Sequence, residues 1–258
     1  MMLINGDVVR TGRHIFKLPE WGFDGVQYEE QVSNGPNILK WERHMRLLER
    51  ILYVMASVNP ALSYMQGFNE LLPPFYYVLL QAITVCDNDI KMVEAISFFC
   101  LQELLTKTEI RDLYTTTDAS SIILHKLNDF NVLLNKHLPR ASAIIKSLGI
   151  HPLLYCYRWF NLMYSQEYEL PVLLGLWDGL FTHFEDLVSY IYYVGIGHVH
   201  AVENGIIPRD YGATIATLQN LEIASIKDVL SFADKCWNED HNVSKSVFSF
   251  SGLFGKRF

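Results

Sequence analysis

Apolar residues recur every three to four positions along most of the chain, a pattern typical of amphipathic helices. The clearest example is the segment 42–58, in which charged residues separate the apolar positions Met45, Leu48, Ile51, Leu52, Met55 and Val58. Asn59-Pro60 is expected to end this helix. Similar stripes and short apolar runs predict further helices near residues 63–73, 75–85, 90–105, 118–138, 142–148, 153–163, 171–181, 184–194, 211–218 and 226–237.

Prolines and an apolar run give two specific expectations for the segment 63–85. A helix that begins near Ser63 or Tyr64 is expected to end at Pro73-Pro74, because an interior proline removes a backbone donor and clashes with the preceding turn. The residues from 75 to 85 are apolar on all sides. We therefore place this second stretch in the core.

Two stretches lack the helical periodicity. Residues 21–40 contain Gly22, Gly25, Gly35 and Pro36 and are expected to form a long surface loop, whereas residues 241–258 alternate serine with phenylalanine and glycine and are expected to form a flexible C-terminal tail. We find no useful strand alternation and no repeat. The fold class predicted is therefore all-α, with a single multi-helix domain over residues 1–240.

Composition excludes several classes of protein. Hydrophobic residues make up 50% and charged residues 19% of the chain, which is incompatible with general disorder. The net charge is −7, and the longest basic cluster is Gly255-Lys256-Arg257, so nucleic-acid binding is not expected. The apolar uncharged runs 71–86 and 187–202 have 16 residues each, fewer than the ~20 of a membrane-spanning helix. The start of the chain does not resemble a signal peptide. We expect a cytoplasmic protein with reduced cysteines.

The common catalytic and cofactor motifs are missing from the sequence. It contains no GxxxxGK[ST], GxGxxG, HExxH or GxSxG pattern. The closest histidine pair is His198 and His200, and side chains two residues apart on a helix point to different faces. We therefore expect neither a metal site nor a nucleotide cofactor in the chain itself.

Four short segments carry a more specific signal. They are Ile4–Thr11 (I-x-x-D-x-x-R-T), Tyr64–Glu70 (Y-x-Q-G-Φ-N-E), Arg158-Trp159-Phe160 followed by Leu176–Phe181, and Leu218-Gln219-Asn220 followed by Ile226–Leu230. With these four motifs in order over residues 4–237, the sequence resembles the TBC-domain family of Rab GTPase-activating proteins. The resemblance implies a TBC-type all-α domain that apparently lacks the helices usually found before the first motif.

What the resemblance implies for function is a pair of catalytic residues supplied in trans, Arg10 and Gln66. The partner is a Rab-family GTPase in its GTP-bound form, and GTP and Mg²⁺ belong to that partner. This chemistry makes physical sense, because phosphoryl transfer spreads charge over the phosphate oxygens and requires a positioned water. A guanidinium is always charged and presents planar donors, and an amide can both accept a hydrogen bond from a water and donate one to a phosphate.

The resemblance gives the neighbouring motif residues supporting or partner-binding roles. Asp7 is expected to orient Arg10, and Gly67 to allow close approach of the GTPase backbone. Thr11 is expected to make local hydrogen bonds, and Tyr64 to position Gln66. The last two residues, Asn69 and Glu70, are expected to touch the GTPase or to brace the loop.

Some alternatives remain open at this point. Arg13 is a rival to Arg10 for the finger, and Asp178 is expected either to cap a helix or to pair with Arg158. Two other functions also fit an all-α domain: a Rab-binding scaffold that does not stimulate hydrolysis, and a helical interaction protein unrelated to GTPases. The resemblance further implies a role in vesicle trafficking, with at most peripheral membrane association through the partner and recruitment to endomembranes.

Overall fold

The computed structural model describes residues 2–15, 40–87, 89–114 and 119–241. Within these ranges the chain consists of α-helices and short 3₁₀ turns without a strand, which confirms the predicted all-α class. No helix there is long and apolar enough to cross a membrane. The loop expected at 21–40 and the tail expected at 241–258 lie outside the described residues, except for Lys40, which begins α2, and His241.

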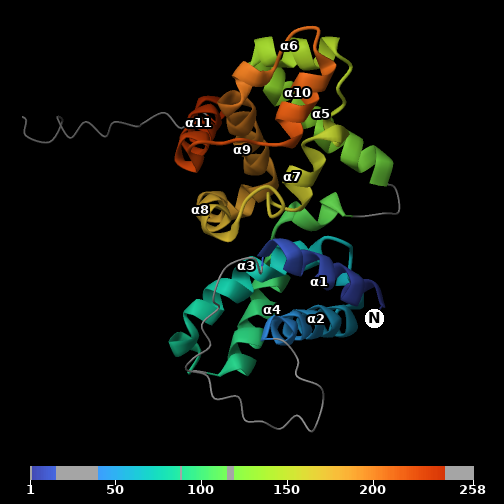
Figure 1. Cartoon of the computed structure of the whole chain (residues 1–258), viewed down its shortest axis with the longest axis vertical. Coiled ribbons are helices and arrows are strands. Elements are labelled where there is room, and N and C mark those ends of the chain that lie inside the picture. Colours follow the sequence, from blue (N-terminus) through green and yellow to red (C-terminus); the bar gives the residue numbers. More distant parts are fainter. Residues whose placement is uncertain (1, 16–39, 88, 115–118, 242–258) are drawn as a thin grey trace, which may run out of the picture.

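The first part of the described chain forms one group of helices in Figure 1. In this group α1 lies against both α2 and α3, and α4 lies against α2 and α3. The group comprises α1 (Met2–Ile15), α2 (Lys40–Val58), α3 (Phe68–Gln81) and α4 (Ile90–Lys107).

The rest of the described chain forms a second group of helices around α9. Twelve of the fifteen residues of α9 are buried, and α11 packs along it. A Cβ atom at Gly197 of α9 would lie 2.4 Å from the Val229 carbonyl oxygen of α11, so glycine permits this close approach. The group comprises α5 (Ala119–His137), α6 (Pro139–Ser147), α7 (Tyr157–Asn161), α8 (Leu170–Phe181), α9 (Leu187–Ala201), α10 (Tyr211–Gln219) and α11 (Ile226–Asp240).

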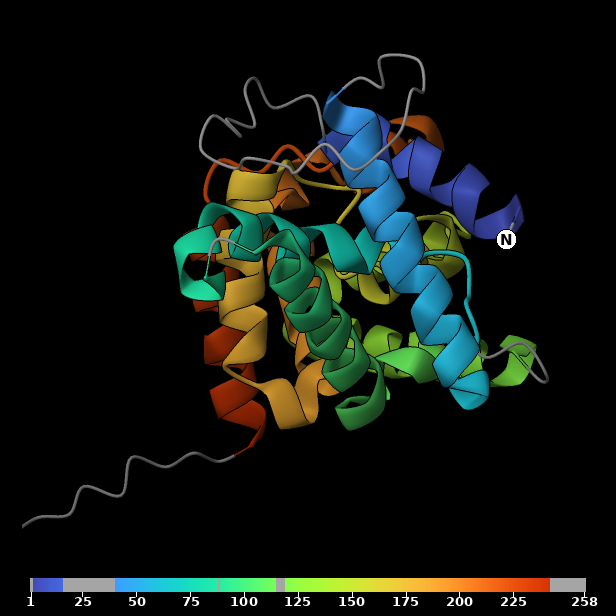
Figure 2. The ribbon, with the colours of Figure 1, turned by 90° about the horizontal axis from the view of Figure 1, so that it is seen from below.

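Aromatic side chains join the two groups where α3 meets α8. Figure 2 shows these two helices next to each other, seen from below. The ring of Phe75 lies 5.3 Å from that of Trp177 and is stacked on that of Phe181 at 6.0 Å, measured between centroids. Aromatic burial is among the larger contributions to core stability, so this contact helps to hold the two groups together.

The expected end of a helix at Pro73-Pro74 is wrong. Helix α3 begins at Phe68 and runs through both prolines to Gln81. Its residues from 68 to 74 are all buried, as are Tyr76 and Leu80, so apolar burial outweighs the backbone bonds that the prolines remove. The placement of all of 75–85 in the core is also wrong, because Val78 and Val85 are 46% and 79% exposed.

Other boundaries differ from the sequence prediction by shorter distances. Helix α6 begins at Pro139 rather than near residue 142, because proline is favoured at the first position of a helix. Helix α9 continues to Ala201 instead of ending near 194. The first motif lies inside a helix, α1, with Ile4 and Val8 buried against the core. Asp7 therefore sits in a helix interior and is not a cap.

Two buried histidines make the stability of the fold sensitive to acid. Burial lowers the pKa of His44 and of His198 to about 4, compared with about 6.5 in an unfolded chain. His198 is fully buried and bonds through Nδ1 to the Val194 carbonyl oxygen at 2.8 Å. Between the two pKa values only the unfolded chain binds the protons, so the free energy of unfolding falls as the pH drops from about 6.5 to about 4.

We therefore expect each of these histidines to lower the free energy of unfolding by about 2 kcal/mol at pH 5 relative to neutral pH. Urea unfolding followed by circular dichroism at pH 7.5 and pH 5 measures the loss. In a His198→Phe variant, the free energy of unfolding should differ less between pH 7.5 and pH 5. The difference should be smaller by about 2 kcal/mol, the contribution of one histidine. An unchanged difference would contradict a neutral, buried His198.

Candidate functional site

A cavity of about 490 Å³ lies where the first motif meets the second. Arg10 and Gln66 both line it, although they are far apart in the sequence. Helix α1 contributes one side, the start of α3 and the loop before it a second, and the region around α7 a third. The lining residues are Asp7, Arg10, Gln66, Gly67, Asn69, Glu70, Tyr157, Asn161, Leu162 and Gln166.

Arg10 is held by a carboxylate one helical turn earlier. Its Nη2 donates to Oδ1 of Asp7 in an i,i+3 ion pair. The Arg10 side chain is 63% exposed, whereas that of Asp7 is 2% exposed. The buried carboxylate therefore anchors one edge of an accessible guanidinium, which has five N–H donors in all.

The same carboxylate reaches the loop that carries Gln66. The hydroxyl of Tyr64 donates to Oδ2 of Asp7 at 2.7 Å and lies 3.1 Å from Oδ1 of Asn69. Burial and the neighbouring Asp7 carboxylate raise the pKa of Tyr64, so the hydroxyl keeps its proton and remains a donor. The buried carboxylate of Asp7 thus holds Arg10 directly and the Gln66 loop through Tyr64.

Gln66 is exposed, two residues before the first residue of α3, and Tyr64 is half-buried. The residue after Gln66, Gly67, has a φ of +110°, a conformation open mainly to glycine. Its amide donates to Oδ1 of Asn69 at 3.0 Å. The loop is therefore fixed by a positive φ and by a hydrogen bond to the first turn of α3.

Gly67 has a reason to be glycine within this chain that the sequence did not indicate. A Cβ atom at this position would lie 2.8 Å from Cε1 of Tyr114 and 2.9 Å from Cδ2 of Leu162, both within this chain. Gly67 is itself buried. The role that the structure gives it is to let the Gln66 loop turn tightly against the core.

Asn69, Glu70 and Thr11 form a buried polar network below the cavity. Nδ2 of Asn69 donates to the hydroxyl of Thr11 and to the backbone oxygen of Asp7, the latter at 3.3 Å. Oε1 of Glu70 lies 3.2 Å from Oγ1 of Thr11. Asn69 and Glu70 are each 5% exposed, so of their two expected roles the geometry favours bracing the loop against α1.

Four residues of the cavity carried no signal in the sequence: Tyr157, Asn161, Leu162 and Gln166. Gln166 is exposed and donates through Nε2 to Oε1 of Glu70 at 3.3 Å. It therefore connects the second group of helices to the network under Arg10. Its neighbourhood has no recognisable spacing, and only tertiary packing brings it to the cavity.

The third and fourth motifs have a structural role in this arrangement. Arg158 pairs with Glu167 through Nε at 2.5 Å and Nη2 at 3.0 Å, and it also donates to the backbone oxygen of Gln219 at 3.2 Å. The expected pairing of Arg158 with Asp178 is therefore wrong. Asp178 is exposed in the interior of α8, so it does not cap that helix either.

His198 and His200, the closest pair in the sequence, diverge in the structure. His198 is fully buried and stacks on Tyr164 at 4.4 Å, whereas His200 is exposed and stacks on Phe232 at 3.9 Å. Among the described residues, no three His, Cys, Asp or Glu side chains gather as metal ligands do.

Replacing Gly67 with alanine is expected to disturb the Gln66 loop. The added methyl group meets Tyr114 and Leu162 at less than 3 Å, and an L-residue at positive φ is strained by about 1–2 kcal/mol. We expect the variant to unfold at a lower urea concentration and to lose any activity that depends on Gln66. Gly6→Ala is the matched control on α1, since nothing lies within 4 Å of its Cβ position. Equal stability of the two variants would contradict this role of Gly67.

Comparisons with known proteins agree with the fold and with the family that the motifs indicated. A family model described as the Rab-GTPase-TBC domain matches residues 34–207. This range includes Gln66 but begins after Arg10. Human TBC1 domain family member 13 is 28% identical over 74% of this chain and 47% of its own length. The GTPase-activating protein gyp1 of Schizosaccharomyces pombe is 32% identical over 56% of this chain and 30% of its own length.

The alignments thus span less than half of each of these two relatives. Among solved structures, the Ypt/Rab-GAP domain of Gyp1p superimposes with a TM-score of 0.65 over 93% of this chain and 81% of that chain, at 18% identity. This similarity supports the fold, and the family model covers most of the chain. The chain therefore belongs to the RabGAP-TBC family.

Proposed function

We propose that this domain stimulates GTP hydrolysis by a Rab-family GTPase, with Arg10 and Gln66 acting in trans. The observation that carries the proposal is their convergence. Both residues line one open cavity, and the buried carboxylate of Asp7 bonds to Arg10 and to Tyr64, two residues before Gln66. Family membership and the gyp1 relative support a GTPase-activating role in general.

Arg10 is suited to stabilise the charge that develops on the transferred phosphoryl group. Its guanidinium is exposed and anchored on one edge, so its other donors are available to phosphate oxygens. A guanidinium stays charged throughout and fits such oxygens with paired hydrogen bonds. An arginine supplied in trans in this way increases the rate of hydrolysis by about 10³–10⁵.

Gln66 is suited to position the attacking water. Its side-chain amide offers one acceptor and two donor hydrogens, so it can hold a water and a phosphate oxygen together. The loop fixed by Gly67 and Asn69 presents this amide at the cavity. GTP and Mg²⁺ enter with the partner GTPase, and the residues of this chain orient the water and stabilise charge.

Asp7 acts as a positioning residue for both fingers. It bonds to the guanidinium of Arg10 and to the hydroxyl of Tyr64, two residues before Gln66. A rigid link of this kind lowers the cost of ordering two side chains at once when the partner binds. Asn69, Glu70 and Thr11 hold α1 against the start of α3 and so fix the distance between the two motifs.

The partner that we propose is a Rab protein in its GTP-bound form. A role in vesicle trafficking, a cytoplasmic location and recruitment to endomembranes through the partner follow from that proposal and from the family. Which Rab is recognised depends on the surface around the cavity, which no short motif encodes.

A hydrolysis assay against a panel of GTP-loaded Rab proteins tests the proposal. We expect at least one Rab protein to release phosphate faster in the presence of the domain. An amount of domain well below that of the Rab protein should be sufficient. Binding of a Rab without stimulation would replace the proposal by a scaffold function. Failure to bind or stimulate any member of a complete panel would favour a helical interaction protein with another partner.

A further inference from the structure

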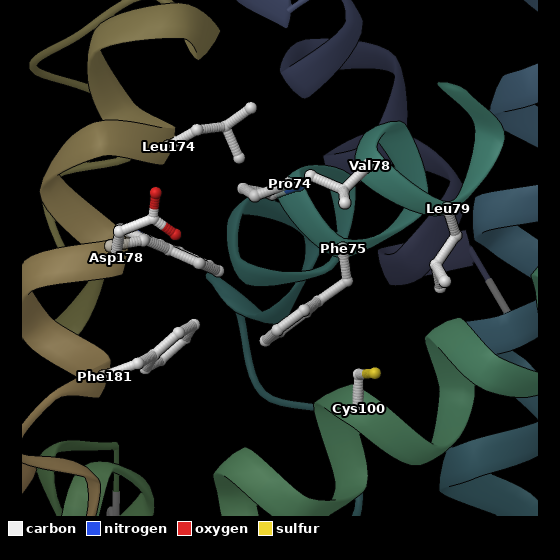
Figure 3. A pocket seen from close by; sticks show the side chains of 9 residues that line it. Pro74, Phe75, Val78, Leu79, Cys100, Leu174, Asp178 and Phe181 are labelled. Atoms are coloured by element: carbon white, nitrogen blue, oxygen red, sulfur yellow. The ribbon is translucent and has the colours of Figure 1, made fainter. Parts of the chain in front are cut away.

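A second, apolar cavity of about 220 Å³ opens between α3, α4 and α8. Figure 3 shows Phe75 and Val78 of α3 facing Leu174 and Phe181 of α8, with Cys100 of α4 alongside. The walls are aliphatic and aromatic, and Asp178 is their only charged residue. An open apolar cavity of this kind fits a large apolar side chain.

The surface beside this cavity is acidic. Between residues 166 and 208 the sequence contains no lysine or arginine. Three carboxylates of this stretch, Asp178, Glu185 and Asp186, are exposed on α8 and on the turn after it. A basic segment that carries aromatic residues would complement both the cavity and its surroundings.

The described part of the chain ends close to this region. His241 stacks on Trp237 with ring centroids 3.7 Å apart, and Trp237 lies 5.0 Å from His183. His183 follows Phe181, a wall of the cavity, by two residues, a separation of no more than about 7 Å along the chain. The end of α11 is therefore connected to the wall of the cavity by two ring contacts and by the two-residue separation between His183 and Phe181.

The residues that follow have the complementary composition. Residues 242–258 contain Lys245, Lys256 and Arg257 and no acidic residue. Their apolar run, from Val247 to Phe254, consists of valine, leucine and phenylalanine interrupted only by serine and glycine. Within the run, Phe248 and Phe250 alternate with serine, and side chains two apart share one face of an extended chain. The seven residues from 242 to 248 span up to about 23 Å when extended, enough to reach the cavity.

We propose that residues 247–254 of this same chain dock on the cavity between α3 and α8. One of the rings of Phe248 and Phe250 fills the cavity, and the other covers its rim, where Val78 is 46% exposed. The basic residues that flank this segment, Lys245, Lys256 and Arg257, face the acidic surface of α8. This inference does not depend on the proposed activity toward a GTPase.

Alkylation of Cys100 by N-ethylmaleimide tests the docking. Cys100 lines the cavity and is partly exposed, whereas Cys86, Cys156 and Cys236 are buried. The rate of alkylation of Cys100 therefore reports whether the cavity is occupied. In the full chain with Phe248→Ser and Phe250→Ser, we expect Cys100 to react about tenfold faster than in the unchanged protein, the factor that burial of a large apolar side chain corresponds to. Peptide mapping by mass spectrometry identifies the modified cysteine.

The matched control is Phe258→Ser, the same chemical change outside the apolar run, and it should leave the rate unchanged. Circular dichroism confirms that all the variants are folded. Equal rates in the double variant and in the unchanged protein would overturn the proposal. A rate that falls with increasing protein concentration would also overturn it, because a second copy would then be the occupant.

Disulfide trapping gives an independent reading of proximity. In a Phe250→Cys variant under mild oxidation, we expect a disulfide within one chain between position 250 and Cys100. The additional change Cys100→Ser should abolish it. Absence of this crosslink in both a Phe250→Cys and a Phe248→Cys variant would place the segment elsewhere and contradict the proposal.

Discussion

Replacing Arg10 with alanine is expected to reduce the stimulation of GTP hydrolysis by about 10³–10⁵, which corresponds to roughly 4–7 kcal/mol of transition-state stabilisation. The guanidinium side chain is 63% exposed, so its removal should leave the fold intact. Stopped-flow measurement of phosphate release from the responding Rab gives the rate. Binding to a complex with a transition-state mimic should weaken more than binding to the GTP-bound state, because the finger acts mainly in the transition state.

Two further variants give this prediction its controls. Arg10→Lys should restore little activity, since an ammonium lacks the planar donors of a guanidinium. Arg13→Ala, at the rival position in the same helix, should behave like the unchanged protein. If Arg13→Ala abolishes stimulation and Arg10→Ala does not, the first motif has been assigned to the wrong arginine. If neither variant has an effect while a Rab still binds, the scaffold function replaces the catalytic one.

Replacing Gln66 with alanine is expected to lower the rate of stimulated hydrolysis by about 10²–10³, the usual loss when one group that stabilises a transition state is removed. Gln66 is exposed, so stability to urea should not change. The expected effect is on the maximal rate more than on the concentration of domain needed to reach it. Gln81→Ala is the matched control, because Gln81 is an exposed glutamine at the C-terminal end of α3, the helix that follows the Gln66 loop.

Combining the two substitutions separates joint from independent action. If Arg10 and Gln66 act in one transition state, the double variant should be little worse than Arg10→Ala alone. Additive losses, with the two free-energy effects simply summed, would contradict joint action of Arg10 and Gln66 in one transition state. A Gln66→Ala variant with the full rate would show that the partner positions its own water.

The sequence was sufficient to predict features that depend on residues close together in the chain. Apolar spacing alone predicted the helix at 42–58, observed as Lys40–Val58, and the helix at 226–237, observed as Ile226–Asp240. Amphipathic periodicity specifies such helices because each has one buried face. The motif residues Arg10 and Gln66 were also identifiable from the sequence, because their neighbours form recognisable patterns.

The sequence prediction was wrong where local propensity and tertiary packing favour different structures. Pro73 and Pro74 predicted the end of a helix, but burial of Leu71, Leu72 and Tyr76 keeps α3 continuous. Neither of the two roles expected for Asp178, a helix cap or a pair with Arg158, is observed, because ion pairs depend on distances that the sequence does not contain. Local propensity is overridden whenever tertiary packing contributes more free energy.

The sequence by itself determined the class of fold, the family and the two candidate finger residues. Only the tertiary structure decided that Asp7 joins Arg10 to Tyr64 and that Gln166 enters the same cavity. It also decided that Gly67 faces Tyr114 of its own chain. Contacts between residues distant in the sequence arise from the packing of whole helices, and no pattern within a short window records them.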